Sequence, residues 1–209
     1  MTYRQFSGAA VLSLALAACG KSERSALPDS VALTSDTAVG TAQNNTASSN
    51  MTFNLTSPAF APNGSMASKY TCEGRDTSPP LEWSRAPTGA RSFALIVEDP
   101  DAPDPAKPTR VVSHWVLYNI PAGTTSLAEN AAKSGLPAGT AQGSNERKTQ
   151  TYMGPCPPIG RHRYFFKLSA LDTELTGLTN ATKADLEKAM QGHVVANAQV
   201  IGTYEKAKK

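Results

Sequence analysis

The side chains most able to do chemistry lie at the ends of apolar stretches or in proline-stiffened loops. They are Asp99, Asp101, His114, His162, Tyr164 and the loop around Cys156. Imidazole N–H groups, a tyrosine hydroxyl and loop amides are all hydrogen-bond donors, and together they suit a small anion such as phosphate. Because a carboxylate would repel that anion, we expect Asp99 to hydrogen-bond a histidine and fix its tautomer, or to be protonated in an apolar site.

Other interpretations of the same residues remain open. Asp101 and Asp104 belong to an Asp-Pro-rich run, which is typical of side chains that cap turns. A metal site made from His114, His162 and an aspartate is a further interpretation, but no short ligand spacing supports it, and we predict no metal. His162 and Tyr164 would, on the plainest view, only satisfy backbone groups at a strand end.

The first residues carry a targeting signal. Arg4 precedes an apolar stretch, Phe6–Ala17, which is too short to span a membrane as a mature helix. It ends in Leu16–Gly20, Leu-Ala-Ala-Cys-Gly, which resembles the lipobox of bacterial lipoproteins. In such proteins cleavage precedes the cysteine, here Cys19, and acyl chains on it anchor the protein. Ordinary secretory cleavage after Ala18 is the alternative.

The cysteine count follows from this assignment. With Cys19 lipidated, Cys72 and Cys156 remain, and an oxidising cell envelope favours a disulfide between them. Two free, buried thiols are the alternative. A Cys156–His162 nucleophile, and hence a cysteine hydrolase, is a remote possibility because prolines surround Cys156 and no helix begins there to lower its pKa.

The chain divides into three parts. We assign residues 1–18 to the signal peptide, residues 19–50 to the lipidated cysteine with a flexible tether, and residues 51–209 to one folded domain. The tether has few large apolar side chains and no periodicity. With 40% hydrophobic residues in 209, the remainder can bury a real core. The formal charge of +3 is mild and no basic stripe is present, so we predict no nucleic-acid partner.

The elements that must position the polar side chains are short strands. Strands are predicted at Met51–Leu55, Leu81–Trp83, Ser92–Glu98, Val111–Pro121, the second half of Tyr152–Asp172, and His193–Tyr204. Thr182–Asp185 has the form of a capping box, which predicts a helix at about Lys183–Gln191 that ends at Gly192. Many strands and one clear helix favour a β-sandwich-like domain.

The motifs resemble those of a known family. The matching segments are Asp99–Pro103, Ser113–Trp115, Gly154–Pro158 and His162–Tyr164, supported by Tyr70–Cys72, Ser78–Trp83 and Gly202–Tyr204. In this order they resemble the signature blocks of the phosphatidylethanolamine-binding protein family, and most closely its bacterial branch, often labelled Raf-kinase-inhibitor-like. The resemblance covers residues 51–205.

This resemblance implies a mainly β fold of two antiparallel sheets with Greek-key connections and one or two peripheral helices. It implies a pocket for phosphate, acetate or a phosphorylated head group, formed by Asp99, His114, His162, Tyr164 and the backbone around Cys156 and Pro157, with Asp101 as the second motif aspartate. It suggests a cis peptide at Ser78–Pro79 or Pro79–Pro80. The C-terminal helix that lines the pocket in eukaryotic members is expected to be missing, which leaves the mouth more open.

The predicted function is non-catalytic binding of a small anionic or phosphorylated ligand, without a cofactor, by an envelope lipoprotein. Gly20 after the cysteine points to the outer membrane, facing the periplasm. The alternative is an interaction or inhibitor module that receives a protein target, a protease or kinase, in the same pocket. The kinase version is disfavoured because no cytoplasmic kinase is accessible from the envelope.

Overall fold

The computed structural model describes residues 52–207. The predicted signal peptide, the lipidated Cys19 and the tether up to residue 50 lie outside the described residues. Within the described part, no helix has both the length and the apolar character needed to cross a membrane.

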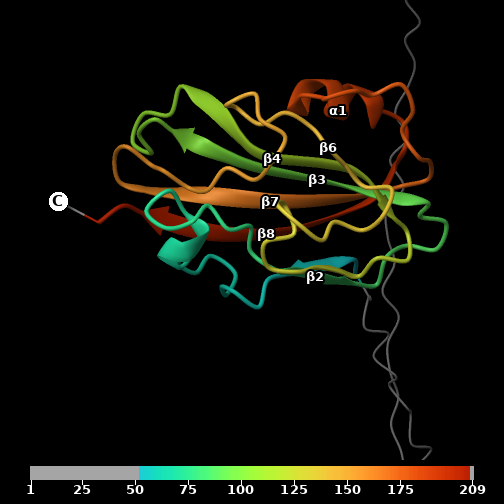
Figure 1. Cartoon of the computed structure of the whole chain (residues 1–209), viewed down its shortest axis with the longest axis horizontal. Coiled ribbons are helices and arrows are strands. Elements are labelled where there is room, and N and C mark those ends of the chain that lie inside the picture. The colour runs from blue at the N-terminus through green and yellow to red at the C-terminus, as the bar shows by residue number, and fades with distance from the viewer. Residues whose placement is uncertain (1–51, 208–209) are drawn as a thin grey trace, which may run out of the picture. The chain divides into compact units, whose positions relative to one another are not determined.

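Two antiparallel sheets form the domain, as predicted (Figure 1). The smaller sheet has the order β1-β2-β5, with β1 at Asn54–Thr56, β2 at Leu81–Ser84 and β5 at Ser126–Leu127. The larger sheet has the order β6-β4-β3-β7-β8, with β6 at Ala141–Gln142, β4 at Arg110–Pro121, β3 at Ser92–Ala102, β7 at Arg161–Leu171 and β8 at Val194–Glu205.

The main core lies between the two sheets. Along β7 the buried side chains alternate with more exposed ones from Arg161 to Lys167, so that His162, Tyr164 and Phe166 share one face, as the sequence predicts. Tyr164 and Phe166 belong to this inter-sheet core together with Trp83 from β2. The period of two therefore places the start of β7, with its histidine, directly beside the core.

Helix α1, Lys183–Ala189, lies on the opposite side of the larger sheet from β2 (Figure 1). The predicted capping box is present: the Thr182 hydroxyl accepts from the Asp185 amide, and the Asp185 carboxylate accepts from the Thr182 amide. Leu186 is fully buried against this second face. A short 3₁₀ helix, η1, covers Ser68–Tyr70.

Strand β3 is longer than predicted. The Asp-Pro-rich run was expected to leave the sheet after Glu98, but the strand continues to Ala102. The pairing with β4 shifts by one residue between Asp99 and Ala102, so an extra residue is absorbed as a bulge. The cis peptide bond of the described residues is Ala102–Pro103, which corrects the expectation of a cis bond at Ser78–Pro79 or Pro79–Pro80.

A bulge on β4 sets the direction of His114. Val97 pairs with Trp115, whereas the next residue of β3, Glu98, pairs with Ser113, so His114 is the extra residue. In a regular strand His114 would face away from Trp115. Instead Trp115 lies in the inter-sheet core, and the His114 ring packs edge-on against Tyr164 of the same core, with centroids 5.2 Å apart. Bulges commonly re-aim a side chain in this way.

Candidate functional site

A cavity of about 260 Å³ lies where β3, β4 and β7 meet the loop that precedes β7. Five of the sequence-predicted residues line it: Asp99, His114, Cys156, Pro157 and His162. Most of the wall is apolar, from residues such as Val112 and Met153. A largely apolar cavity with a few converging polar groups is typical of a small-ligand site.

Asp99 and His162 form a buried pair. The Asp99 Oδ2 atom lies 2.7 Å from His162 Nδ1, and both side chains are almost completely buried. The other carboxylate oxygen, Oδ1, accepts from the Asp101 amide at 2.8 Å. The expected role of Asp99 in orienting an imidazole is therefore seen in the structure.

His162 has no N–H left for a ligand. Its Nε2 lies 3.0 Å from the Ile159 carbonyl, which can only accept, so Nε2 carries a proton. The other ring nitrogen, Nδ1, is engaged by the Asp99 carboxylate. Both ring nitrogens are thus bound within the protein, so the predicted donation from His162 to a ligand would require one of these contacts to break.

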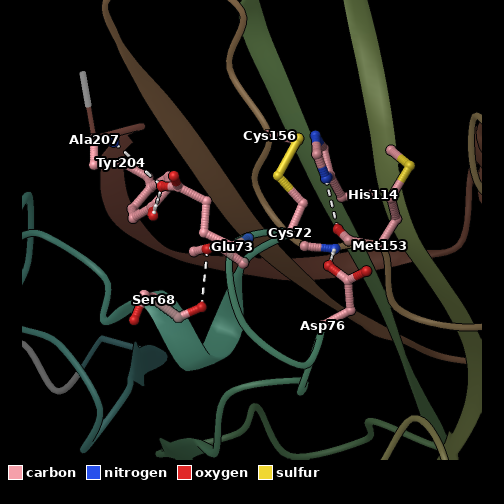
Figure 2. The surroundings of a disulfide bond; sticks show 11 residues. Ser68, Cys72, Glu73, Asp76, His114, Met153, Cys156, Tyr204 and Ala207 are labelled. Atoms are coloured by element: carbon pink, nitrogen blue, oxygen red, sulfur yellow. Dashed lines mark hydrogen bonds between the residues drawn. A yellow bond between two sulfur atoms is a disulfide. The ribbon is translucent and has the colours of Figure 1, made fainter. Parts of the chain in front are cut away.

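His114 has one engaged and one unpaired ring nitrogen. Nδ1 lies 2.6 Å from the Met153 carbonyl and donates to it, while Nε2 is buried without a hydrogen-bond partner among the described residues. Figure 2 shows the ring with Nδ1 toward Met153 and its other nitrogen pointing away. Burial lowers the pKa of His114, and the bond to Met153 only partly opposes this. In the neutral ring Nε2 is therefore an acceptor.

Tyr164 and Asp101 do not line the cavity. The Tyr164 hydroxyl is buried without a hydrogen-bond partner in the described part, and burial, with the charge of Asp99, raises its pKa well above the ordinary value. Asp101 accepts from the Arg163 guanidinium through both oxygens, at 2.7 and 2.9 Å, and this lowers its pKa. Asp101 is thus an arginine partner rather than a turn cap, whereas Asp104 does cap a turn through the Ala106 amide.

The loop beside the cavity is tied down by the Cys72–Cys156 disulfide, which confirms the predicted pairing (Figure 2). The bond leaves Cys156 no thiolate, so the hydrolase interpretation loses its nucleophile. Next to the bridge, the Cys72 amide donates to the Pro155 carbonyl and the Gly154 amide donates to Asp76 Oδ1. A β-carbon on Gly154 would lie 2.3 Å from that oxygen, so the close approach requires glycine.

Few amides of this loop are available to a ligand. The Met153 amide donates to the His114 carbonyl, the Gly154 amide is used as above, and Pro155, Pro157 and Pro158 have no amide hydrogen. From Met153 to Pro158, only the Cys156 amide is without an acceptor among the described residues. The expected set of loop donors thus reduces to one.

Sequence reasoning missed three charged residues of the cavity wall: Arg110, Glu146 and Arg147. Arg110 pairs with Glu146 at 3.3 Å, whereas the Arg147 guanidinium has no ion pair within residues 52–207. Asn145 positions this segment, because its buried side chain accepts from the Arg147 amide and donates to the Thr151 carbonyl. The signal in the sequence is the charged run Glu146–Lys148 within a mostly uncharged stretch.

Two arginines and two carboxylates are the charged residues of the cavity wall. Arg110 pairs with Glu146, and the Asp99 carboxylate is engaged by His162. Arg147 then remains as an unpaired positive group among the lining residues that the structure describes. No group of three His, Cys, Asp or Glu side chains in residues 52–207 is arranged to hold a metal ion.

The profile of the phosphatidylethanolamine-binding protein family matches residues 56–205, so this chain belongs to that family. A UPF0098 protein of Methanothermobacter thermautotrophicus is 49% identical over 154 residues, which cover 73% of this chain and 99% of the relative. A UPF0098 protein of Chlamydia pneumoniae is 44% identical over 153 residues, with 73% and 99% covered.

Two solved structures have the same fold. A putative phosphatidylethanolamine-binding protein homologue from Chlamydia trachomatis is 40% identical, with a TM-score of 0.68 over 75% of this chain and 99% of that one. YbcL of Escherichia coli, described as a member of the mammalian family, is 34% identical, with a TM-score of 0.68 over 74% of this chain and 99% of that one.

Proposed function

We propose that this domain binds a small anionic or phosphorylated ligand, without catalysis, in the cavity beside the Cys72–Cys156 disulfide. The observation that carries the proposal is the Arg147 guanidinium, a cation without an ion pair in the described chain, on the wall of a mostly apolar cavity. An unpaired cation at such a site attracts an anion, and a guanidinium can contact phosphate through two parallel hydrogen bonds.

The other polar groups of the cavity have different roles in this proposal. The Cys156 amide supplies a second donor, while His114 presents Nε2 as a buried polar atom without a partner in the described residues. Asp99 and His162 hold the walls in place through their own pair. Two charge-assisted hydrogen bonds at about 1.5–3 kcal/mol each, less the cost of association, give an affinity on the order of millimolar for free phosphate.

The cavity supports binding rather than turnover. None of its lining residues in the described structure carries a free thiol, hydroxyl or amine, because Cys156 is bonded and the other residues are Asp, Glu, Arg, His, Met, Gly, Pro, Ala and Val. The thiol, hydroxyl and amine nucleophiles of covalent catalysis are therefore missing from the lining residues, and both oxygens of the Asp99 carboxylate are already engaged.

We also propose, from the segment Leu16–Gly20, that the mature protein is a lipid-anchored envelope protein.

Calorimetric titration of inorganic phosphate tests the site. We expect Arg147→Met to weaken binding about tenfold or more, because it removes one charge-assisted bond. Arg91→Met is the matched control, since Arg91 is exposed, as Arg147 is, but does not line the cavity. Equal isotherms for wild type and Arg147→Met would remove the assignment. Phosphate binding lost equally in both variants would point to a site elsewhere.

A further inference from the structure

We propose that the cavity selects an anion that still carries a proton, such as monohydrogen phosphate or a singly protonated phosphomonoester, over a fully deprotonated tetrahedral anion such as sulfate. The inference deepens the proposed function and rests on it. It follows from the direction of the hydrogen bond that His114 makes with Met153.

The Met153 carbonyl can only accept, so the proton of the neutral His114 ring is on Nδ1, at 2.6 Å from that oxygen. Nε2 then has a lone pair and no proton. A sulfate or other bare anion would place an oxygen lone pair against this nitrogen, whereas a P–O–H group would donate to it. Nε2 therefore forms a hydrogen bond only with a ligand that carries a proton.

The surroundings of His114 favour the neutral ring. The charged and titratable groups around it are Asp99 on β3, Arg110 on β4, Glu146 and Arg147 after β6, His162 and Tyr164 on β7, and Asp76 after η1. Burial is the largest influence on the pKa of His114 and lowers it, and Arg147 lowers it further, while the Met153 bond, Asp99 and Asp76 raise it. Protonating Nε2 would also create a buried cation close to Arg147, which an incoming anion would have to offset.

No protein group already satisfies Nε2. Tyr164 packs against the ring edge-on, with its centroid 5.2 Å from that of His114, yet neither its hydroxyl nor Nε2 has a hydrogen-bond partner in the described chain. Buried polar atoms without a partner are uncommon and call for an explanation. A ligand hydroxyl that enters the cavity would supply the missing bond. Because Nε2 is buried, a ligand reaches it only if the atoms that cover it move.

The test compares inorganic phosphate with sulfate by calorimetry at mildly alkaline pH. Under these conditions both are tetrahedral dianions, because the second pKa of phosphate is about 6 to 7 and lies below the working pH. Only phosphate still carries a proton, since its last proton is lost far above this pH. We expect phosphate to bind about tenfold or more tightly than sulfate, since sulfate leaves the buried acceptor unpaired. Equal affinities would overturn the inference while leaving the proposed function intact. Binding of neither anion would overturn both.

The variant His114→Asn tests whether the Nε2 lone pair causes the preference, because it can keep the contact with Met153. His114→Asn can keep a side-chain N–H donor toward the Met153 carbonyl but lacks Nε2, and we expect its phosphate-to-sulfate ratio to fall toward one. His193→Asn is the matched control, because this third histidine is exposed, pairs with Asp172 and does not line the cavity. Retention of the full wild-type preference in His114→Asn would also overturn the inference.

Discussion

Among single residues, Asp99 determines how the site is built. Its two oxygens are both used, one by the Asp101 amide and one by His162 Nδ1, and it is 4% exposed. The carboxylate therefore does not meet an incoming anion as a free charge. It holds β7 against the bulged end of β3 and fixes which way the His162 ring faces.

The variants Asp99→Asn and Asp99→Leu are expected to differ strongly in stability. In Asp99→Asn the amide can donate to Nδ1 of a neutral His162 ring and accept from the Asp101 amide, so the cost is expected to stay below about 1.5 kcal/mol. Asp99→Leu leaves the buried His162 nitrogen without a partner and is expected to cost about 3–5 kcal/mol. Urea unfolding measures both, and a leucine variant as stable as the asparagine variant would contradict the paired arrangement.

Among the elements, Glu98 joins β3 to β7 and α1. It is 5% exposed and pairs with Lys167 of β7 and with Lys183 at the start of α1. Burial alone would raise the pKa of Glu98, but the hydrogen bonds from the two lysines together lower it below its ordinary value of 4.5. A carboxylate whose pKa is lower in the folded state stabilises the fold above the unfolded pKa, and this stabilisation is lost as the pH falls through the folded pKa.

Acid unfolding should therefore depend on this ion-pair cluster. We expect the wild type to lose stability as the pH drops below 4.5, and Glu98→Gln to lose less over the same range while costing about 1–3 kcal/mol at neutral pH. Glu187→Gln is the matched control, because Glu187 also faces Lys183, at 3.6 Å, but its side chain is 52% exposed. That surface pair is expected to contribute less than about 0.5 kcal/mol. Thermal melts measured across pH test this prediction. The same loss of stability at acid pH in wild type and Glu98→Gln would refute it.

Local patterns predicted most of the elements, and non-local contacts explain the failures. The capping box at Thr182, the alternation along β7 and the apolar run of β3 are set by neighbours in the sequence, and the structure confirms them. The bulge at His114 is not visible locally, because it arises from the pairing of β4 with β3. The prolines after Glu98 likewise suggested that β3 ends early, but pairing with β4 continues to Ala102.

The candidate site was predictable in composition but not in geometry. Asp99, His114, Cys156, Pro157 and His162 do meet at one cavity. The direction of each hydrogen bond depends on partners far along the chain, such as Met153 for His114, and no spacing rule gives those partners. Arg147 was missed for a similar reason, because the Asn145-centred turn places it at the cavity only in the folded chain.

For the molecule as a whole, the disulfide fixes the rim of the cavity. Cys72 follows η1 and Cys156 precedes β7. The bond therefore joins two segments that are 84 residues apart in the sequence, next to the proposed site. The proposed envelope location and this bond agree with each other, because disulfides form and persist in oxidising compartments.

The anchor is tested on the intact protein expressed in a bacterial host. Cys19→Ala removes the thiol that would be lipidated, so we expect the protein to move from the outer-membrane fraction to the soluble periplasmic fraction, with cleavage still possible after Ala18. Gly20→Asp is the matched variant and is expected to remain membrane-bound but to shift to the inner membrane. A wild-type protein that is already soluble in the periplasm would exclude the anchor.

The central claim is that an anion binds in the cavity between His114 and Arg147, and a crystal structure of the domain saturated with phosphate tests it most directly. The account predicts one phosphate with an oxygen within hydrogen-bond distance of His114 Nε2 and another at the Arg147 guanidinium, with the Met153 contact of His114 retained. An empty cavity at a phosphate concentration that saturates the protein in solution, or phosphate bound only elsewhere, would contradict it.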